Sequence, residues 1–408
     1  AKRTHQPTSV DQLRELVATS ERIRVLGTGH SFNRIADTTG DLVSLAGLPP
    51  LVRIDPQRRQ VTIGAGMRYG DLVTHLHAAG WALPNLASLP HISVAGACAT
   101  GTHGSGDRNG NLATAVRALQ MVTASGDLVT LDREADGDRF AGAVVALGAL
   151  GVVTELTLDV VPAFDVRQYV YDDLPREQLE EHLDEIFASG YSVSLFTDWT
   201  GPRINQVWRK CRADDPAAAT PPTRWFGATL ADEPRHPVPG MPTENCTVQL
   251  GVPGPWHARL PHFRLEFTPS HGEELQSEYV IDRRHARHAL AALDEIAADI
   301  SRVLQISEIR TIARDELWLS PNYHRDSVAF HFTWIADAEA VLPVVDAVER
   351  QLAPFAPRPH WGKLFGIPPE TLAQRYERLA DFRRLVRHYD PTGKFGNEML
   401  DTYLDETR

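Results

Sequence analysis

The sequence predicts an α+β protein with two domains. Its 408 residues are 42% hydrophobic, so the chain can bury a large core, and chains of this length commonly divide into two domains. Short runs typical of strands are mixed irregularly with helical segments, unlike the regular β-α-β order of dinucleotide-binding folds. The character of the sequence changes near Phe164, where we expect the second domain to begin.

The first part of the chain contains clear helix and strand signals. Ser9 and Gln12 form a capping box ahead of a helix that carries Leu13, Leu16 and Val17 on one face. Strands are predicted at 22–26, 60–63, 115–122 and 128–131, and further helices at 69–79 and 140–147.

The second part begins with a proline-rich stretch. Residues 212–257 show little periodicity, which indicates a long, ordered loop that crosses a sheet. Amphipathic helices are predicted at 287–304 and 338–352. Pro343 either kinks the second of these or marks its start.

Charge and cysteine content exclude several classes of protein. The formal net charge of −12 offers no basic surface for nucleic acid or for anionic lipid, so neither is expected as a partner. No apolar run is long enough for a membrane span, and residues 1–20 lack the apolar core of a secretory signal, so a cytoplasmic location is expected. The three cysteines and the scattered histidines show no metal-ligand spacing, and no metal is predicted.

Two glycine-rich segments are candidates for ligand binding. In the first, GTGHS at 27–31, two glycines let the backbone turn tightly and present N–H groups to an anion, although an ordinary tight turn has the same pattern. His30 favours the binding interpretation, because an imidazole has little structural reason to lie beside a phosphate cradle. The second segment, 93–104, has small side chains that allow close approach to a flat ligand, and a third small-residue piece follows at 148–154.

Strand periodicity places polar side chains on one face of a predicted sheet. In residues 328–334, His331 and Thr333 fall on the face opposite the large apolar side chains. Glu308 and Arg310 are also two residues apart and share a face. This pattern fits a sheet that lines a pocket, and it also fits a surface ion pair next to a buried core histidine.

Taken together, these motifs resemble a known flavoprotein family. Segments 24–31, 95–104 and 147–154 look like the FAD domain of the vanillyl-alcohol oxidase superfamily, in the branch of the alditol oxidases and the sugar 1,4-lactone oxidases. The resemblance continues through 275–280 and 360–363 to DPTGKF at 390–395 with Asn397. It implies an FAD-binding α+β domain and a cap domain with a large antiparallel sheet flanked by helices.

The resemblance also implies the domain limits and the cofactor site. The expected FAD-binding domain comprises 1–165, the substrate-binding cap domain 166–357, and a segment at 358–408 returns to the FAD domain. FAD is expected to be linked covalently through His30. The other expected cofactor-binding residues are Gly27, Thr28, Gly29, Ser31, Phe32, Ser88, Ser93, Gly96, Thr100, Gly101, Thr102, His103, Val153 and Lys363. Cys98 is interpreted as a buried packing thiol rather than a second link to the flavin.

The implied activity is the oxidation of small polyols. The resemblance assigns substrate contacts to Ser88, Glu308, Arg310, Thr333 and Lys363, and catalysis to Arg310, Lys363 and His331. A hydride would pass from the terminal primary alcohol carbon of an alditol such as xylitol or sorbitol to flavin N5, giving the aldose. Dioxygen would then yield hydrogen peroxide, and Ala87 is the position expected to control its access. A monomer is expected.

Two other functions fit the same sequence. One is a sugar 1,4-lactone oxidase or dehydrogenase of the same superfamily, which would act on a ring substrate. The other is a non-catalytic protein that binds flavin or carbohydrate in the same pocket. A lysine at the flavin edge argues against the second, because such a module gains little from it.

Overall fold

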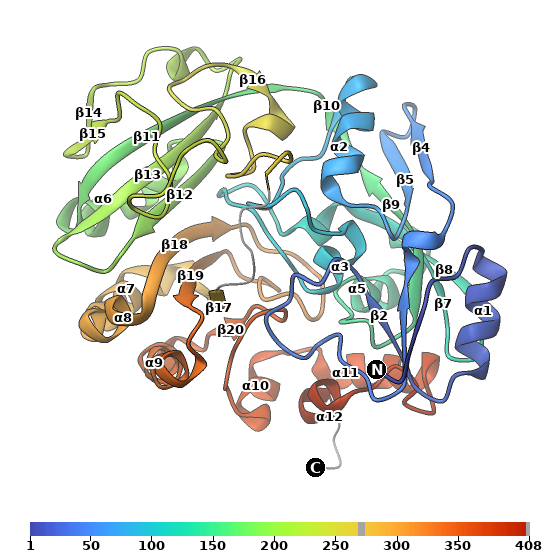
Figure 1. Ribbon diagram of the computed structural model, residues 1–408. Coiled ribbons are helices and arrows are strands. Elements are labelled where there is room, and N and C mark those ends of the chain that lie inside the picture. Colours follow the sequence, from blue (N-terminus) through green and yellow to red (C-terminus); the bar gives the residue numbers. More distant parts are fainter. Residues whose placement is uncertain (268–273, 405–408) are drawn as a thin grey trace.

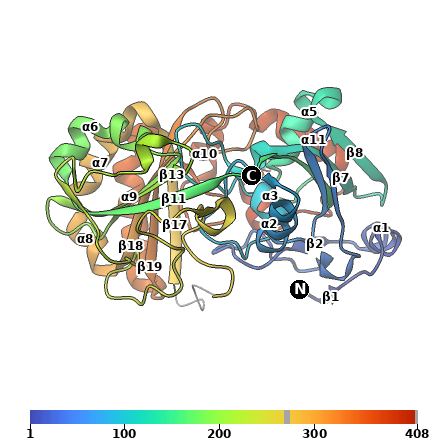
Figure 2. The same ribbon diagram turned by 90° about the horizontal axis from the view of Figure 1, so that it is seen from above.

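The computed structural model describes residues 1–267 and 274–404, and it confirms the α+β class. The N-terminal half contains three small sheets, and the following part of the chain forms one large antiparallel sheet (Figure 1). Seen from above, these two parts lie side by side, and the C-terminal helices pack beneath the N-terminal half (Figure 2).

The N-terminal half has a five-stranded antiparallel sheet in the order β4-β5-β9-β7-β8, a parallel sheet β1-β3-β2 and a small pair β10-β6. Its helix α1 begins at the predicted cap, where the Ser9 hydroxyl accepts from the Gln12 N–H at 3.2 Å. The elements are β1 Arg3–His5, α1 Val10–Thr19, β2 Ile23–Leu26, β3 Asp41–Ser44, β4 Val52–Asp55, β5 Gln60–Gly64, α2 Tyr69–Ala78, β6 Trp81–Ala82, α3 Val94–Ala99, β7 Val116–Val122, β8 Leu128–Asp132, α4 Arg133–Asp136, α5 Asp138–Val144, β9 Val152–Asp159 and β10 Val161–Pro162.

The large sheet has the order β14-β15-β11-β13-β12-β18-β19-β17-β20, with β16 paired to β11. Helices α6, α7, α8 and α9 lie along its outer side (Figure 1). The elements are β11 Asp165–Pro175, α6 Arg176–Ala188, β12 Ser192–Thr197, β13 Arg203–Arg212, β14 Arg224–Trp225, β15 Ala228–Leu230, β16 Gly254–Pro255, β17 Glu274–Asp282, α7 Ala286–Asp294, α8 Ala297–Val303, β18 Leu304–Ile312, β19 Ser327–Ile335, α9 Ala338–Leu352, β20 Arg358–Pro359, α10 Pro369–Arg375, α11 Leu379–Tyr389 and α12 Glu398–Leu404.

Three predicted elements differ from the structure. The helix expected at 287–304 is two helices, α7 and α8, because Ile296 adopts a non-helical conformation (φ −114°) and Leu304 already pairs with Trp334 in the sheet. Periodicity did not reveal the break, since Leu290, Leu293 and Ile300 are buried in one core on both sides of it. Helix α9 runs unbroken through Pro343. The helix expected to reach residue 147 ends at Val144.

The proline-rich stretch is an ordered layer over the large sheet, as predicted, and it also adds the short strands β14, β15 and β16 to that sheet. We call residues 213–267 the cover segment. Its Cys246 and Phe263 pack on Phe196 and Trp208 of the sheet, so the cover segment closes one end of the sheet's inner face.

The alternation predicted for 328–334 is confirmed. Phe330, Phe332 and Trp334 lie in the core shared with the outer helices, and the Phe332 and Trp334 rings stack at 4.9 Å. His331 therefore points to the inner face. The strand register then places Glu278 and Glu308 opposite His331 on its two neighbouring strands, so three polar side chains share one row.

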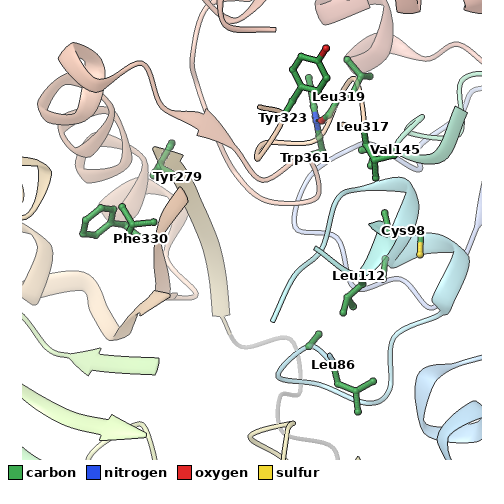
Figure 3. Packing of buried hydrophobic residues seen from close by; sticks show 14 of the residues in the cluster. Leu86, Cys98, Leu112, Val145, Tyr279, Leu317, Leu319, Tyr323, Phe330 and Trp361 are labelled. Carbon is green, nitrogen blue, oxygen red and sulfur yellow. The ribbon is translucent and has the colours of Figure 1, made fainter. Parts of the chain in front are cut away.

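The C-terminal segment is tied into the N-terminal half by buried polar contacts. Lys394 donates to the carbonyls of Val17 (2.6 Å) and Ala124 (2.8 Å), and Asn397 donates to that of Ile35 (3.1 Å). Lys394 gives the DPTGKF motif a physical role, because it satisfies backbone carbonyls of two other segments. Asn397 shares the Ile35 carbonyl with Arg24. Trp361 lies beside Leu317 and Leu319, whereas Cys98 lies near Leu112 on the N-terminal side (Figure 3). Cys98 is a free, buried thiol, in agreement with its interpretation as a packing residue.

Candidate active site

The two glycine-rich segments come together around Ser93. The Ser93 N–H donates to the Thr28 hydroxyl at 3.1 Å, which joins the loop at 27–31 to the start of α3. A Cβ atom added to Gly27 would lie 2.6 Å from the Ser93 hydroxyl oxygen, and one added to Gly96 would lie 2.7 Å from it. A larger residue at either position would have to displace the Ser93 hydroxyl.

The loop at 27–31 is exposed and has the geometry of a phosphate cradle. Gly29 has φ +71°, a conformation that side chains other than glycine rarely adopt, and an added Cβ there would meet nothing within 4 Å. His30 is exposed, and its Nδ1 lies 2.9 Å from the Thr28 hydroxyl. Exposed N–H groups on such a turn, with hydroxyls beside them, fit the pyrophosphate of a dinucleotide cofactor such as FAD.

The C-terminal segment brings Lys363 to this loop. Phe32 donates its N–H to the Gly362 carbonyl at 2.7 Å, and the Asn33 side chain donates to the carbonyls of Trp361 and Lys363 at 2.8 and 2.7 Å. These bonds fix the backbone of Lys363 relative to His30, although the two residues lie far apart in the sequence.

The second glycine-rich segment reaches the same place. The Thr102 hydroxyl lies 3.1 Å from that of Thr100 and 3.2 Å from His360 Nε2. Gly101 has φ +68°, and a Cβ atom added there would lie 3.1 Å from Pro321 Cδ. The predicted cofactor residues Gly27 to Phe32, Ser93, Gly96, Thr100 to Thr102 and Lys363 therefore surround one region, between the two parts of the molecule.

Two predicted cofactor residues have other contacts. Both ring nitrogens of His103 are engaged within the protein, Nδ1 with the Gly104 carbonyl at 2.8 Å and Nε2 with the Glu278 carboxylate. Val153 lies in β9 opposite Met121, and its side chain packs against the core of the N-terminal half. The His103 ring is thus bonded to Glu278, and the Val153 side chain makes apolar contacts with the core.

Glu278 is the centre of the candidate active site. Its side chain is fully buried, and its carboxylate accepts from Arg310 Nη2 (3.0 Å) and Lys363 Nζ (2.6 Å) as well as from His103. His331 Nδ1 lies 3.1 Å from the same carboxylate. One anion therefore holds side chains from β18, β19, the second glycine-rich segment and the C-terminal segment.

The charges of this cluster support one another. Burial opposes ionisation of Glu278, but Lys363, His103 and Arg310 hold its pKa well below the ordinary range. Burial lowers the pKa of Lys363, and Glu278 works against that shift. Burial, together with the nearby Lys363 ammonium, lowers the pKa of His331 to about 4. His331 is therefore a neutral imidazole at neutral pH, which can accept a proton.

The remaining predicted substrate residues line the same inner face. The Thr333 hydroxyl lies 3.1 Å from His331 Nε2, and the Ser88 hydroxyl lies 3.5 Å from Arg310 Nη1. Glu308 Oε1 accepts from His262 Nε2 at 2.8 Å. Burial raises the pKa of Glu308, but Arg310 and His262 outweigh this effect and hold the pKa below its ordinary range. Ala87 is buried next to Ser88. The structure thus brings together Ser88, Glu308, Arg310, His331, Thr333 and Lys363.

Sequence reasoning gave no role to four buried polar residues of this site, which are Glu278, Lys210, His262 and His360. Glu278 had a usable signal, because it precedes Tyr279, Val280 and Ile281 in a buried strand, and a carboxylate in such a strand needs cationic partners. Lys210 and His262 had no recognisable signal in the sequence, since their partners lie in other parts of the chain.

Within residues 1–267 and 274–404, no group of three or more histidine, cysteine, aspartate or glutamate side chains is placed to hold a metal ion. In the same residues, no helix has both the length and the apolar character needed to cross a membrane.

Two protein families match parts of this chain. A family described as "FAD binding domain" matches residues 1–132, and one described as "D-arabinono-1,4-lactone oxidase" matches residues 271–403. The chain is 54% identical over 409 residues to an alditol oxidase from Streptomyces sp. (strain IKD472 / FERM P-14339), covering 99% of this chain and 96% of that protein.

More distant relatives act on lactones, and a structural neighbour shares the fold. The chain is 26% identical to L-gulonolactone oxidase of Mus musculus, covering 97% of this chain and 94% of that one. It is 28% identical to L-gulono-1,4-lactone dehydrogenase of Mycobacterium tuberculosis, with 96% and 94% coverage. The crystal structure of cholesterol oxidase from Brevibacterium sterolicum superimposes with a TM-score of 0.78 at 16% identity, over 98% of this chain and 94% of that chain.

Replacing Glu278 with Gln should destabilise the protein strongly. The variant keeps the shape of the side chain but removes the carboxylate that pairs with Lys363, and it leaves Arg310 with its longer 3.5 Å contact to Glu308. We therefore expect a loss of about 3–5 kcal/mol in the free energy of unfolding. Denaturant unfolding measures this. Adding Lys363→Met to Glu278→Gln should restore part of the stability, because it removes one uncompensated cation. A Glu278→Gln protein as stable as the wild type would contradict the role of Glu278 as the centre of the cluster.

Proposed function

The chain belongs to the alditol oxidases of the vanillyl-alcohol oxidase superfamily, and we propose that it oxidises the terminal primary alcohol of an acyclic polyol such as xylitol or sorbitol to the aldose. The observation that carries this proposal is the cluster around Glu278. Arg310 and a neutral His331 share one face of the large sheet with Glu308 and Thr333, and Lys363 of the C-terminal segment reaches the same cluster. A polyol presents a row of hydroxyls, each both donor and acceptor, and such mixed partners fix its register.

FAD fits the exposed glycine loop, and we propose that it is attached covalently through His30. Gly27, Thr28, Gly29, Ser31 and Phe32 would hold the pyrophosphate side, together with Ser93, Gly96, Thr100, Gly101 and Thr102 of the second segment. Bound FAD supplies the acceptor for a hydride, and dioxygen would reoxidise it to give hydrogen peroxide. Ala87, next to Ser88, is the position we propose for the control of oxygen access.

The side chains of the site would handle the proton and the developing charge. Arg310 and Lys363 are cations aimed at one region, so they would stabilise negative charge on the reacting alcohol oxygen. His331 Nδ1 lies 2.9 Å from the Lys363 ammonium and 3.1 Å from Glu278, and its Nε2 lies 3.1 Å from the Thr333 hydroxyl. The neutral ring would accept the hydroxyl proton or orient the reacting alcohol. Ser88, Glu308 and Thr333 would bind the other hydroxyls of the chain.

A second activity is supported by a specific finding. The family that matches residues 271–403 is described as a lactone oxidase, so oxidation of a sugar 1,4-lactone is the alternative reaction. The lactone-oxidising relatives are much less similar than the alditol oxidase, and this favours the polyol.

The organisation of the chain enters the proposal as well. We propose an FAD-binding domain at 1–165, a cap domain at 166–357 and a returning segment at 358–408. The start of the large sheet at Asp165 in β11 supports the first limit, and the bonds of Lys394 to α1 and to the loop after β7 support the return of the last segment. Its first two residues, Arg358 and Pro359, still pair with β17 in the large sheet. We also propose that the protein is a cytoplasmic monomer.

His30→Ala should abolish covalent attachment of the flavin. Wild-type protein that has been denatured in acid and separated on a gel should retain a fluorescent yellow band, and the variant should lose it because the linking imidazole is gone. His91→Ala is the matched control, since it removes another histidine close to His30 and should keep the band. A colourless wild-type band would refute the covalent link.

The substrate class can be tested by peroxide release from a panel of polyols and lactones. We expect xylitol or sorbitol to give kcat/KM at least about 10-fold above that for galactono-1,4-lactone, because a slot of alternating donors and acceptors suits an open chain. A preference for the lactone would replace the proposed reaction with the alternative one.

Arg310→Ala and Lys363→Ala should each slow anaerobic reduction of the flavin by xylitol, by about 100- to 1,000-fold, with FAD still bound. Each change removes a cation that stabilises charge at the reacting oxygen. Stopped-flow absorbance measures the rate. Arg314→Ala, which removes an exposed arginine just beyond β18, is the control and should reduce normally. Near-normal rates in the first two variants would remove their proposed roles.

A further inference from the structure

Buried polar side chains connect Lys210 of β13 to Glu308 of β18 through His262 of the cover segment. Lys210 on β13 is fully buried, and its Nζ donates to the carbonyls of Leu260 (2.5 Å) and Pro261 (3.1 Å) and to His262 Nδ1 (3.1 Å). His262 Nε2 then contacts Glu308 Oε1 at 2.8 Å. The roles proposed above for the active site do not use Lys210 or His262.

The three acceptors around Lys210 determine the protonation of His262. An ammonium group has three N–H bonds, and those of Lys210 point to three acceptors, the Leu260 carbonyl, the Pro261 carbonyl and His262 Nδ1. Because Nδ1 of His262 accepts from Lys210, the ring proton lies on Nε2 and is donated to Glu308. Burial and the Lys210 charge lower the pKa of His262 to about 4, so the ring is neutral and holds this single orientation of donor and acceptor.

The His262 ring is also fixed by packing. It meets the Phe196 ring at 5.4 Å and the Trp208 ring at 5.2 Å, both edge to face. Its backbone N–H donates to the Ser88 carbonyl at 3.1 Å. His262 therefore has little freedom to follow Glu308 if that carboxylate moves.

Glu308 and Arg310 do not close into a tight ion pair. Glu308 Oε2 lies 3.5 Å from Arg310 Nε, and this buried Nε has no hydrogen-bond partner among the described residues. A free carboxylate next to a guanidinium normally forms bonds of about 2.7–2.9 Å. Its other oxygen is held by His262, so Glu308 is kept back from Arg310.

We propose that Lys210 and His262 are positioning residues that hold Glu308 apart from Arg310, so that the two side chains bind adjacent hydroxyls of the polyol. One hydroxyl donates to Glu308 Oε2, and its neighbour accepts from Arg310 Nε. Without His262, the carboxylate would pair with Arg310, and a hydroxyl would have to break a charge-assisted bond to bind. Arg310 Nη2 stays bonded to Glu278 in either case, so the guanidinium keeps its place near the reacting oxygen. This inference rests on the proposed polyol site.

The test compares His262→Leu, His262→Gln and Lys210→Met in the flavin-loaded protein, with xylitol as substrate. His262→Leu and Lys210→Met should raise KM by about 10- to 100-fold, while kcat changes by less than about 3-fold, because a hydrogen bond to a charged group is lost away from the reacting carbon. His262→Gln should recover most of the loss, since its amide can still donate to Glu308. His236→Leu removes another histidine of the cover segment and should leave KM unchanged.

A double-mutant cycle separates positioning from simple packing. In a Glu308→Gln background, His262→Leu should change KM by less than about 3-fold, because the group through which it acts has gone. An equal KM increase in both backgrounds, or a fall in kcat as large as the rise in KM, would overturn the inference. If Lys210→Met fails to fold, the His262 variants alone decide.

The pH dependence of KM gives an independent readout for Lys210. The charged and titratable groups that face it are His262 and Cys246 of the cover segment and Glu308 and Arg310 of β18. Burial lowers the pKa of Lys210 to about 7, with Glu308 opposing the shift, so the ammonium is lost above that pH and the His262 proton is no longer fixed on Nε2. The ratio of KM between Lys210→Met and wild type should therefore be largest below pH 7 and shrink above it. A ratio that does not vary with pH would overturn the role of Lys210.

These outcomes are distinct from a failure of the proposed function. A wild-type protein that oxidises no polyol would refute the proposed function, and this inference with it. Wild-type turnover of xylitol with unchanged KM in His262→Leu would refute the inference alone.

Discussion

A single buried carboxylate, that of Glu278, determines how this molecule is assembled. A charge without partners in a protein interior is very costly, so Glu278 requires the cations and imidazoles that surround it. Those partners come from the second glycine-rich segment, the large sheet and the C-terminal segment. The two parts of the chain must therefore meet at this point, and the reactive side chains are oriented by the same bonds that join the parts.

The fold supplies this meeting point in two ways. On the sheet side, the antiparallel register puts Glu278, His331 and Glu308 in one row across β17, β19 and β18, while the alternate residues are buried under the outer helices. On the other side, Gly27 lets the loop at 27–31 approach Ser93 closely, at the start of the second glycine-rich segment. Small residues and strand periodicity thus bring a cofactor loop and a polar sheet face together, without any charge in the loop itself.

Much of this arrangement follows from local sequence. The cap at Ser9, the strand at 328–334 with its polar face, and the glycine loops are local patterns, and each is found where it was expected. The break before α8 was not predictable, because one apolar stripe continues through both helices. The contacts of Glu278, Lys210 and His262 were not predictable either. They join distant parts of the chain, and a lone charged or imidazole side chain in a sequence carries no sign of its partner.

The two buried glutamates show why geometry must decide between a structural and a binding role. Both have pKa values held below the ordinary range, and both lie beside Arg310, so charge alone does not distinguish them. Their oxygens do. In Glu278, one oxygen is taken by His103 and the other by Arg310 and Lys363, which leaves little acceptor capacity for a substrate. In Glu308, His262 takes one oxygen, and within residues 1–267 and 274–404 the other oxygen has only the 3.5 Å contact to Arg310 Nε. Because a polyol hydroxyl needs an acceptor that is charged and still available, Glu308 is the carboxylate suited to bind it, and Glu278 is the one suited to hold the site in place.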